Sequence, residues 1–354
     1  MLRSLSKIVF LPDAGSENPF QYELARLLRS RQFEVVIGQK YAIGSTFKAI
    51  GQHRPHLLYY DWVHSFILGQ SWLWSVVKSL VFVLEILYTR HLRGVLMVHT
   101  LHNLQNHAGL HLRLERLVYG FFLRNCTHIR VYSETTKSAA VQKFRLKPER
   151  VAVIQDLPFH FYYQNQLSQA DSRHQLQIAP DAFVYLFFGE LKPYKGLDNL
   201  LRCFAQMAAP TDVLLIAGKS YDTDYFAGLQ KLNHPQVRWY HRFIEAAEVQ
   251  VFFNAANAVV LPFVRIDHSG SADLALSFSK PVVTLQTEAM AQLLAHQSAL
   301  LFAEPAQLTA CLEKAKTIDQ QAVGQRNFEI ADSTNYLDIL QLFAPAHEPP
   351  NLRH

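Results

Sequence analysis

The sequence predicts an α/β protein built from two Rossmann-like domains, each with a doubly wound parallel sheet. Its 354 residues exceed the usual size of one domain. In both halves, short β-rich runs alternate with helix-length segments, which is typical of βαβ units. A polar stretch at 162–182 suits a connection between domains. We therefore expect an N-terminal domain at 1–165, a C-terminal domain at 166–330, and a helix and tail at 331–354 that cross back to the N-terminal domain.

The N-terminal half contains six runs with the apolar character of buried parallel strands. These predicted strands are Lys7–Leu11, Glu34–Ile37, His56–Tyr60, Gly94–His99, Ile129–Ser133 and Val151–Ile154. Longer segments between them predict helices at Gln21–Arg31, Ser45–Gln52, Trp72–Arg93 and Leu110–Asn125. The alternation predicts a parallel sheet with helices on its faces.

The C-terminal half repeats the same alternation. Its predicted strands are Phe183–Phe188, Asp212–Ala217, Val237–Tyr240, Ala258–Pro262 and Pro281–Leu285. Helices are predicted at Leu197–Met207, Ala246–Asn254 and Ser271–Ser279, with a further helix ending at Leu232. The chain from about Ala306 to Phe343 is polar and helical. We therefore expect a second doubly wound unit followed by helices.

Composition limits the function only broadly. Hydrophobic residues make up 49% of the chain and charged residues 18%, which indicates folded domains. The net charge of +5 comes from dispersed Lys and Arg, so we expect no nucleic-acid binding. Three cysteines without ligand spacing predict neither disulfides nor a zinc site, and the short apolar start predicts no secretory signal. We expect a cytoplasmic protein.

A glycine turn with two lysines follows the first strand of the C-terminal half, in the segment FFGELKPYKG. Gly189 allows a backbone to approach a ligand closely, and Lys192 and Lys195 can place ammonium groups beside phosphate oxygens. An ordinary strand-to-helix turn with solvated lysines explains the spacing equally well. The segment is neither a Walker loop nor a GxGxxG motif.

Small residues precede the helix after the fourth strand of this half, at Ser269, Gly270 and Ser271. The first amides of that helix could bind a diphosphate, because the helix dipole favours negative charge there. Ser269 or Ser271 could instead serve as the N-cap. The two roles are compatible.

With these segments in place, the chain resembles the GT-B glycosyltransferases of the family-4 (group 1) type, in particular the branch that builds bacterial surface polysaccharides and exopolysaccharides. Four pieces, which cover about 183–285, carry the resemblance: FFGELKPYKGLDNLLRCF, VLLIAGKSYD, WYHRFIEAAEVQVFFNAANAVVLPF and SGSADLALSFSKPVV. The resemblance implies two Rossmann-like domains facing each other across a cleft. It also implies transfer of a hexosyl group from a UDP- or GDP-sugar to a saccharide or lipid-linked saccharide acceptor.

The resemblance implies a donor site in the C-terminal domain. It consists of Gly189, Lys192 and Lys195 at the diphosphate, Gly218 and Lys219 beside the nucleotide, the backbone near Phe243 and Ile244 around the base, and Ser269, Gly270 and Ser271 at the phosphate-binding helix. Cations and free amides can stabilise the departing diphosphate, so we expect no cofactor and no protein-bound metal.

The sequence departs from the family at two places. Many relatives carry two glutamates eight positions apart, where this chain has Ile266 and Leu274. The arginine that usually follows the strand glycine is replaced by Glu190. These changes keep open a non-catalytic GT-B subunit that binds a sugar nucleotide or a partner glycosyltransferase. A sugar-nucleotide epimerase is a third alternative.

Polar residues in the N-terminal half follow the ends of predicted strands, where parallel sheets place their chemistry. They are Asp13, Asp61 and His102. His102 is the first candidate for contact with the reacting centre, as a general base if the enzyme inverts or as a polar support if it retains. On the resemblance, the acceptor side also includes Asn18, Asn103 and His107. The histidines at 99, 102 and 107 lack a carboxylate at ligand spacing, so we predict no metal site.

The apolar segment from Trp72 is nearly long enough to span a bilayer, but Lys78 and Glu85 argue against spanning. It could be a core helix packed on the sheet. Its tryptophans and basic end at 90–93 would also suit a bilayer interface near a lipid-linked acceptor. We expect both roles, with one side buried and peripheral contact with the inner membrane face through the helix at 72–93.

Overall fold

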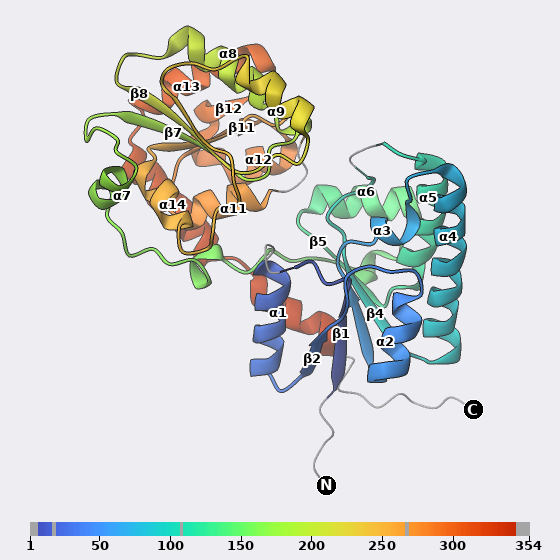
Figure 1. The fold of residues 1–354 in the computed structure, drawn as a ribbon. Coiled ribbons are helices and arrows are strands. Elements are labelled where there is room, and N and C mark those ends of the chain that lie inside the picture. The colour runs from blue at the N-terminus through green and yellow to red at the C-terminus, as the bar shows by residue number, and fades with distance from the viewer. Residues whose placement is uncertain (1–5, 16–18, 107–108, 266–268, 345–354) are drawn as a thin grey trace. The chain divides into compact units, whose positions relative to one another are not determined.

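The computed structural model describes residues 6–15, 19–106, 109–265 and 269–344. It divides the chain into two compact units (Figure 1). Unit 1 comprises 1–157 together with 335–354, and unit 2 comprises 158–334. The first division thus falls earlier than the predicted boundary at 165, and the return to unit 1 begins at Asn335 rather than at 331.

Unit 1 contains a six-stranded parallel sheet in the order β2-β1-β3-β4-β5-β6. Its strands are β1 (Lys7–Leu11), β2 (Glu34–Ile37), β3 (Leu57–Tyr60), β4 (Leu96–Thr100), β5 (His128–Val131) and β6 (Val151–Val153). The order changes direction between β1 and β3, and such a switch point is where α/β sheets commonly bind ligands.

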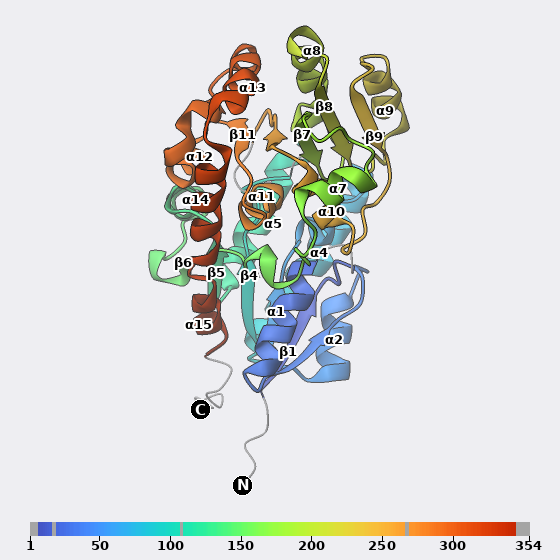
Figure 2. The same cartoon turned by 90° about the vertical axis from the view of Figure 1, so that its left-hand side faces the viewer.

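The helices of unit 1 lie on both faces of this sheet. They are α1 (Pro19–Ser30), α2 (Ser45–His53), α3 (His64–Ile67), α4 (Trp72–Leu87), α5 (Leu112–Asn125), α6 (Glu134–Phe144) and α15 (Ile339–Phe343), and a π-helical turn at Tyr88–Leu92 extends α4. Helix α15 lies against the sheet near β5 (Figure 2), where the ring of Phe343 is 5.7 Å from that of Tyr59. Asn335 holds the returning chain by bonding the amide of Gln155 and the carbonyl of Val153.

Unit 2 contains a second parallel sheet of six strands, in the order β12-β11-β10-β7-β8-β9. The strands are β7 (Phe183–Phe188), β8 (Asp212–Ala217), β9 (Val237–Tyr240), β10 (Ala258–Leu261), β11 (Val282–Leu285) and β12 (Leu301–Phe302). This is the order of a dinucleotide-binding sheet, with its switch point between β7 and β10. The fold is therefore α/β with two doubly wound sheets, as the sequence predicts.

Helices cover both faces of the unit 2 sheet (Figure 1). One core packs under α7 (Gln169–Gln175), α10 (Val249–Ala255), α11 (Gly270–Ser277), α12 (Glu288–Leu293) and α14 (Gln320–Asp332). The other packs under α8 (Leu197–Met207), α9 (Thr223–Gln230) and α13 (Leu308–Thr317). Short 3-10 turns lie at Pro148–Arg150, Phe159–Phe161, Pro193–Lys195, Ala295–Leu300, Pro305–Gln307 and Tyr336–Asp338.

Local sequence explains where many helices begin. A side-chain oxygen accepts a hydrogen bond from the amide three residues later and satisfies a helix donor that has no partner in its own helix. Residues that do this are Ser71, Ser133, Ser168, Asp222, Ser269, Thr287 and Asp319. Two of these caps, Ser133 and Thr287, lie two residues after the ends of β5 and β11, so they place helix N-termini at the carboxyl edges of the sheets.

Candidate active site

The switch point of unit 2 brings together the turn after β7 and the helix after β10. Gly189 directly follows β7 and has φ 116°, a conformation that glycine adopts without strain. The space that a β-carbon on Gly189 would occupy lies 3.0 Å from Lys195 Nζ and 3.2 Å from Ser271 Oγ. An ammonium, a hydroxyl and a bare glycine backbone therefore share one small region.

Lys195 is the most unusual cation of this region. Among the described residues, its ammonium has no hydrogen-bond or ion-pair partner. Burial lowers the pKa of Lys195 to about 8, although Glu190 raises it. A desolvated ammonium without a paired anion is a suitable contact for phosphate oxygens.

Helix α11 begins at the same place. Ser269 is buried and is the N-cap, because its side chain accepts a hydrogen bond from the amide of Ala272 at 3.3 Å. Ser271 donates to the carbonyl of Phe188 at 3.2 Å and so joins α11 to the end of β7. Gly270 is the first residue of the helix, so the amides of its first turn lie near the region that Gly189, Lys195 and Ser271 share. The cap role of Ser269 and an anion-binding role are compatible here.

Close backbone contacts fix this edge of the sheet. A β-carbon on Gly218 would lie 2.0 Å from the carbonyl oxygen of Gly189, and one on Gly196 would lie 2.0 Å from that of Pro262. Both positions therefore require glycine. Gly218 was predicted as a site residue, whereas Gly196 was not. Gly196 also has φ 67°, which lets the 3-10 turn that carries Lys195 end directly at α8.

The other predicted donor residues divide into exposed and buried groups. Lys192 is exposed and pairs with Glu190 at 2.9 Å. Lys219 is also exposed and lies over the ring of Tyr221 at 4.8 Å. Phe243 is partly exposed, but the side chain of Ile244 lies in the core, so only the backbone at Ile244 could frame a base.

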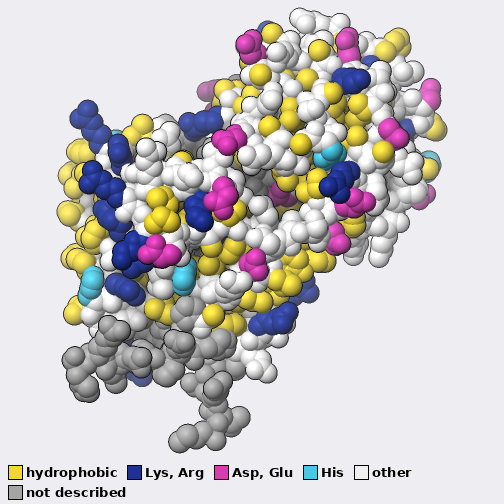
Figure 3. Space-filling view, turned by 180° about the vertical axis from the view of Figure 1, so that it is seen from behind, with side chains coloured by type: hydrophobic (Ala, Val, Ile, Leu, Met, Phe, Trp, Pro, Cys, Tyr) yellow, Lys and Arg dark blue, Asp and Glu magenta, His cyan; other side chains and the backbone are white. Residues whose placement is uncertain are grey.

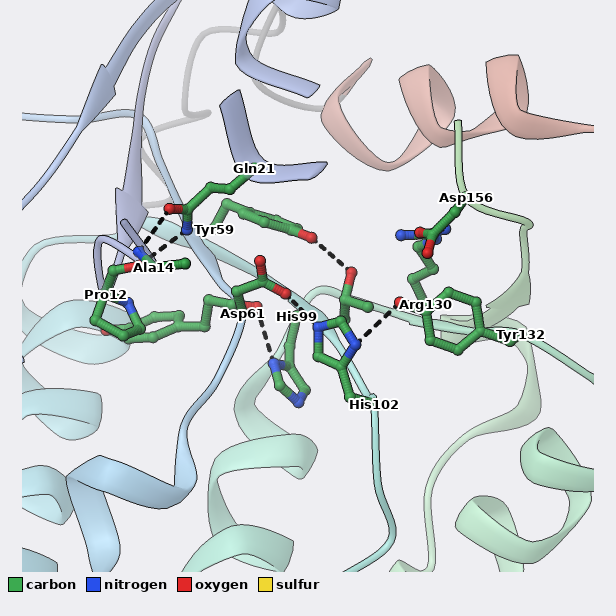
Figure 4. Close-up of polar contacts among 12 residues, drawn as sticks. Pro12, Ala14, Gln21, Tyr59, Asp61, His99, His102, Arg130, Tyr132 and Asp156 are labelled. Carbon is green, nitrogen blue, oxygen red and sulfur yellow. Dashed lines mark hydrogen bonds and ion pairs between the residues drawn. The ribbon is translucent and has the colours of Figure 1, made fainter. Parts of the chain in front are cut away.

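In unit 1, the three neighbouring strands β3, β4 and β5 bring polar groups to the carboxyl edge of the sheet (Figure 4). Asp61 follows β3 and is fully buried, His102 follows β4, and Tyr132 follows β5. Asp61 Oδ1 bonds His102 Nε2, and Tyr132 Oη lies 3.0 Å from His102 Nδ1. The indole ring of Trp62 stacks on the imidazole with 4.7 Å between centroids. His102 is therefore held on three sides.

The surroundings fix the proton positions in this cluster. Burial raises the pKa of Tyr132, and the carboxylates of Asp156 and Asp61 raise it further, whereas Arg130 lowers it. Tyr132 therefore keeps its proton and donates to Nδ1 of His102. The Nε2 proton then faces the carboxylate of Asp61. In this tautomer the lone pair of Nδ1 accepts the hydrogen bond from Tyr132.

A buried ion pair lies beside this cluster. Arg130 on β5 is fully buried, and it donates to Asp156 Oδ1 at 2.6 Å and to the carbonyl of Ile154 at 3.0 Å. Its guanidinium also lies over the ring of Tyr132, 4.8 Å from the centroid. The pair fixes the tyrosine that bonds His102.

The remaining predicted residues of unit 1 are not joined to His102. Asp13 accepts from Tyr22 Oη at 2.8 Å and from the amide of Gly15 at 2.9 Å, so it shapes its own loop. Asn103 is partly buried beside His102 in sequence, without a bond to it in the described structure. Predictions for Asn18, His107 and Ile266 lie outside the described residues.

The histidine cluster does not form a metal site in the described structure. His99 is buried between the carbonyl of Tyr60 and the hydroxyl of Tyr119, so both of its ring nitrogens are occupied. Burial lowers the pKa of His99 to about 3, which keeps it neutral. Among the described residues, no group of three or more His, Cys, Asp or Glu side chains could hold a metal ion.

Sequence reasoning missed Trp62 and Tyr132. Trp62 directly follows Asp61, so the rule that selected Asp61 could also have found it, whereas Tyr132 lies inside the predicted strand Ile129–Ser133 and follows the strand only because β5 ends at Val131. Their contacts with His102 depend on β3, β4 and β5 being neighbours, which the sequence alone does not specify.

Part of unit 2 is similar to a known protein family. Residues 182–317 match the sequence profile of the family described as Glycosyl transferases group 1. No curated protein sequence matches the chain.

Several solved structures resemble the whole chain. Sucrose-phosphate synthase from Thermosynechococcus elongatus is 16% identical with a TM-score of 0.76, over 96% of this chain and 98% of that one. Anabaena HepE, in complex with UDP and glucose, is 17% identical with a TM-score of 0.69, over 96% and 100%. WaaG, a glycosyltransferase involved in lipopolysaccharide biosynthesis, is 16% identical with a TM-score of 0.65, over 96% and 98%. These likenesses show the GT-B fold.

Proposed function

We propose that this protein is a metal-independent glycosyltransferase that transfers a hexosyl group from a UDP- or GDP-sugar to a saccharide or lipid-linked saccharide in surface polysaccharide biosynthesis. The observation that carries the proposal is the ammonium of Lys195, which is desolvated and unpaired beside Gly189 at the switch point of unit 2. The match of 182–317 to glycosyltransferases and the UDP in HepE support a nucleotide sugar as the ligand.

The proposed donor site uses three kinds of group. Lys195 contacts the diphosphate, the first amides of α11 bind it along the helix dipole, and Gly189 lets the backbone approach. As the glycosidic bond breaks, negative charge grows on the leaving diphosphate, and these groups stabilise it. Such stabilisation requires no metal ion, so we expect chelators to leave turnover unchanged.

On the acceptor side, we propose that His102 contacts the reacting centre. Asp61 and Tyr132 hold both ring nitrogens of His102, which orients the imidazole; a role as general base requires the acceptor hydroxyl to replace the Tyr132 hydroxyl at Nδ1. If the enzyme inverts, His102 is the general base for the acceptor hydroxyl. If it retains, the same geometry provides polar support without proton abstraction.

The experiment that tests this proposal is donor turnover. The purified full chain is incubated with UDP- and GDP-hexoses, with and without extracted lipid-linked saccharides, and nucleoside diphosphate release is measured. Acceptor-dependent release from one donor, lost in Lys195→Met, is the expected result. If a nucleotide binds but no donor is turned over with any acceptor, the proposal that the protein is an enzyme is refuted.

One observation favours a second candidate, a non-catalytic subunit that binds a sugar nucleotide. Leu274 stands where many relatives carry a glutamate, and its side chain is buried in the core of unit 2. Glu190, in place of the usual arginine, pairs with Lys192. Both changes remove contacts to the donor sugar, so this candidate predicts nucleotide binding without transfer.

We also propose a cytoplasmic protein that contacts the inner membrane face through α4. The helix Trp72–Leu92 is long and apolar enough to cross a membrane, and only 33% of its most apolar part is buried. Its polar residues are used inside unit 1, because Lys78 donates to the carbonyl of Leu68 and Glu85 accepts from the first amides of α2. Because these bonds attach α4 to the rest of unit 1, they support a helix that lies on a membrane over one that spans it.

The outer side of α4 supports this contact. Leu73, Leu80 and Leu84 are 72%, 61% and 58% exposed. Figure 3 shows this apolar margin of unit 1 with a line of Lys and Arg side chains beside it. An apolar helix face flanked by basic groups suits an anionic bilayer surface. Sedimentation with anionic vesicles should fall in Leu73→Glu/Leu80→Glu, and unchanged sedimentation would contradict this contact.

A further inference from the structure

A cavity lies at the amino edge of the unit 1 sheet, opposite the edge that carries Asp61 and His102. Its volume is about 180 Å³. It is formed where α5 and α6 end and where β5 and β6 begin. The lining residues are Leu123, Arg124, Ile129, Arg145, Leu146, Lys147 and Arg150.

The lining combines cations with an apolar floor. Four of the seven lining residues are Arg or Lys, and none is acidic. The other three are aliphatic and buried. Four cations around one small cavity repel one another unless an anion joins them. The composition of the cavity therefore indicates a ligand with negative charge.

Two of the guanidinium groups are already positioned. Arg124 donates through Nη1 to the carbonyl of Phe144 at 3.1 Å, and Arg150 donates through Nη1 to the carbonyl of Arg124 at 3.4 Å. These carbonyls belong to the ends of α6 and α5, where the helix dipole is negative. Because the arginines donate to these carbonyls, the carbonyl oxygens already have hydrogen-bond partners. Each guanidinium keeps further N–H donors for a ligand.

The other two cations are free. Arg145 and Lys147 are exposed, and neither side chain has a hydrogen-bond or ion-pair partner within the residues that the structure describes. Two fixed and two free cations can surround an anion from several sides.

Neighbouring groups respond to the same positive charge. Burial lowers the pKa of His128, and Arg150 lowers it further. At Cys126, burial raises the pKa of the thiol, whereas Arg90 and Arg150 act in the opposite direction. Arg150 therefore acts on both of these buried or half-buried groups.

We propose that this cavity binds a phosphate group, either on a lipid headgroup or on a small soluble phosphoester. Arginine pairs match the geometry of phosphate oxygens, and the aliphatic floor suits the carbon atoms next to the ester. Drug-sized ligands occupy pockets of roughly 300 Å³ or more, so this smaller cavity suits a headgroup rather than a nucleotide sugar. The proposal does not rest on the glycosyltransferase function.

The test compares two sources of phosphate. Sedimentation measures binding to phosphatidylcholine vesicles with and without phosphatidic acid, and calorimetry measures binding of glycerol 3-phosphate. The test variant is Arg145→Gln/Lys147→Gln, and Lys147→Glu alone is a second variant. The matched control is Arg31→Gln/Lys40→Gln, which removes two exposed charges of unit 1 far from the cavity in sequence.

The expected result is binding in at least one arm that weakens about thirtyfold in Arg145→Gln/Lys147→Gln, as for two basic contacts with a phosphate surface. The control should stay within about threefold of the unmodified protein. Vesicle binding that weakens in Arg145→Gln/Lys147→Gln assigns the site to a lipid, and glycerol 3-phosphate binding that weakens in the same variant assigns it to a soluble ligand. Binding of vesicles through α4 would not change in this variant. Absence of binding in both arms, or binding that this variant leaves unchanged or weakens no more than the control does, overturns the proposal. So does an equal loss of binding to oleate vesicles in this variant, because oleate carries charge without phosphate.

Discussion

Replacing Lys195 with methionine should stabilise the protein while it removes nucleotide binding. In the free protein the ammonium is desolvated and, among the described residues, unpaired. Methionine is similar in length to the lysine stem and carries no charge. The substitution therefore removes an electrostatic penalty together with the cation that we propose for the diphosphate.

The pKa of Lys195 sets the size of the effect. Burial lowers it from 10.5 to about 8, which at ~1.36 kcal/mol per pH unit corresponds to about 3 kcal/mol against the charged form. Partial exposure and solvent screening reduce this figure, so we expect a gain of about 1–2 kcal/mol at pH 7. Between pH 8 and 10.5 the unfolded chain holds the proton more tightly, so stability from this group rises with pH in the unmodified protein. That rise should vanish in the variant.

Calorimetric melting of the full chain measures this effect. A gain of 1–2 kcal/mol corresponds to a rise in Tm of about 2–8 °C for a unit of this size. Lys231→Met, at an exposed lysine of unit 2, is the matched control and should change the stability by less than ~0.5 kcal/mol. A lower Tm for Lys195→Met, or an unchanged affinity for the nucleotide that the unmodified protein binds, would refute the reasoning.

Further predictions concern both units and the absence of a metal. His102→Asn should lower turnover about 100-fold or more while donor affinity measured by calorimetry stays within a few-fold, and equal turnover would exclude a role at the reacting centre. Gly218→Ala should weaken nucleotide binding and lower Tm, because its β-carbon would lie 2.0 Å from the carbonyl oxygen of Gly189; unchanged values would show that the edge can yield. Asp156→Ala should cost about 3–5 kcal/mol in unfolding measurements, because it leaves a buried arginine uncompensated. Chelation with EDTA should leave turnover unchanged, and loss of turnover would indicate a metal ion.

Most strands were predictable because they are short and largely apolar runs. Phe183–Phe188 and Asp212–Ala217 have the bounds that the sequence predicts, since parallel strands buried on both faces leave a clear pattern. Strand β12 was not predicted, because two residues give no periodicity. The division at Leu157 was placed late, because the polar stretch that marked it lies inside unit 2.

The contacts among the candidate site residues were not predictable from the sequence, and the membership of the site stays a prediction. Spacing could not distinguish Lys192 from Lys195, whereas the structure turns one toward Glu190 and the other toward Gly189. Lys192 precedes the 3-10 turn at Pro193–Lys195 in an extended conformation, whereas Lys195 is the last residue of that turn. The bond between Asp61 and His102 likewise depends on the order of strands, which no local pattern encodes.

The central claim is that unit 2 binds a nucleoside diphosphate at Lys195. The most direct measurement is a calorimetric titration of UDP, GDP and ADP into the unmodified protein and into Lys195→Met. We expect one of these nucleotides to bind the unmodified protein, and the variant to bind it at least ~10-fold more weakly. If none of them binds the unmodified protein, or if the variant binds equally well, the claim is wrong.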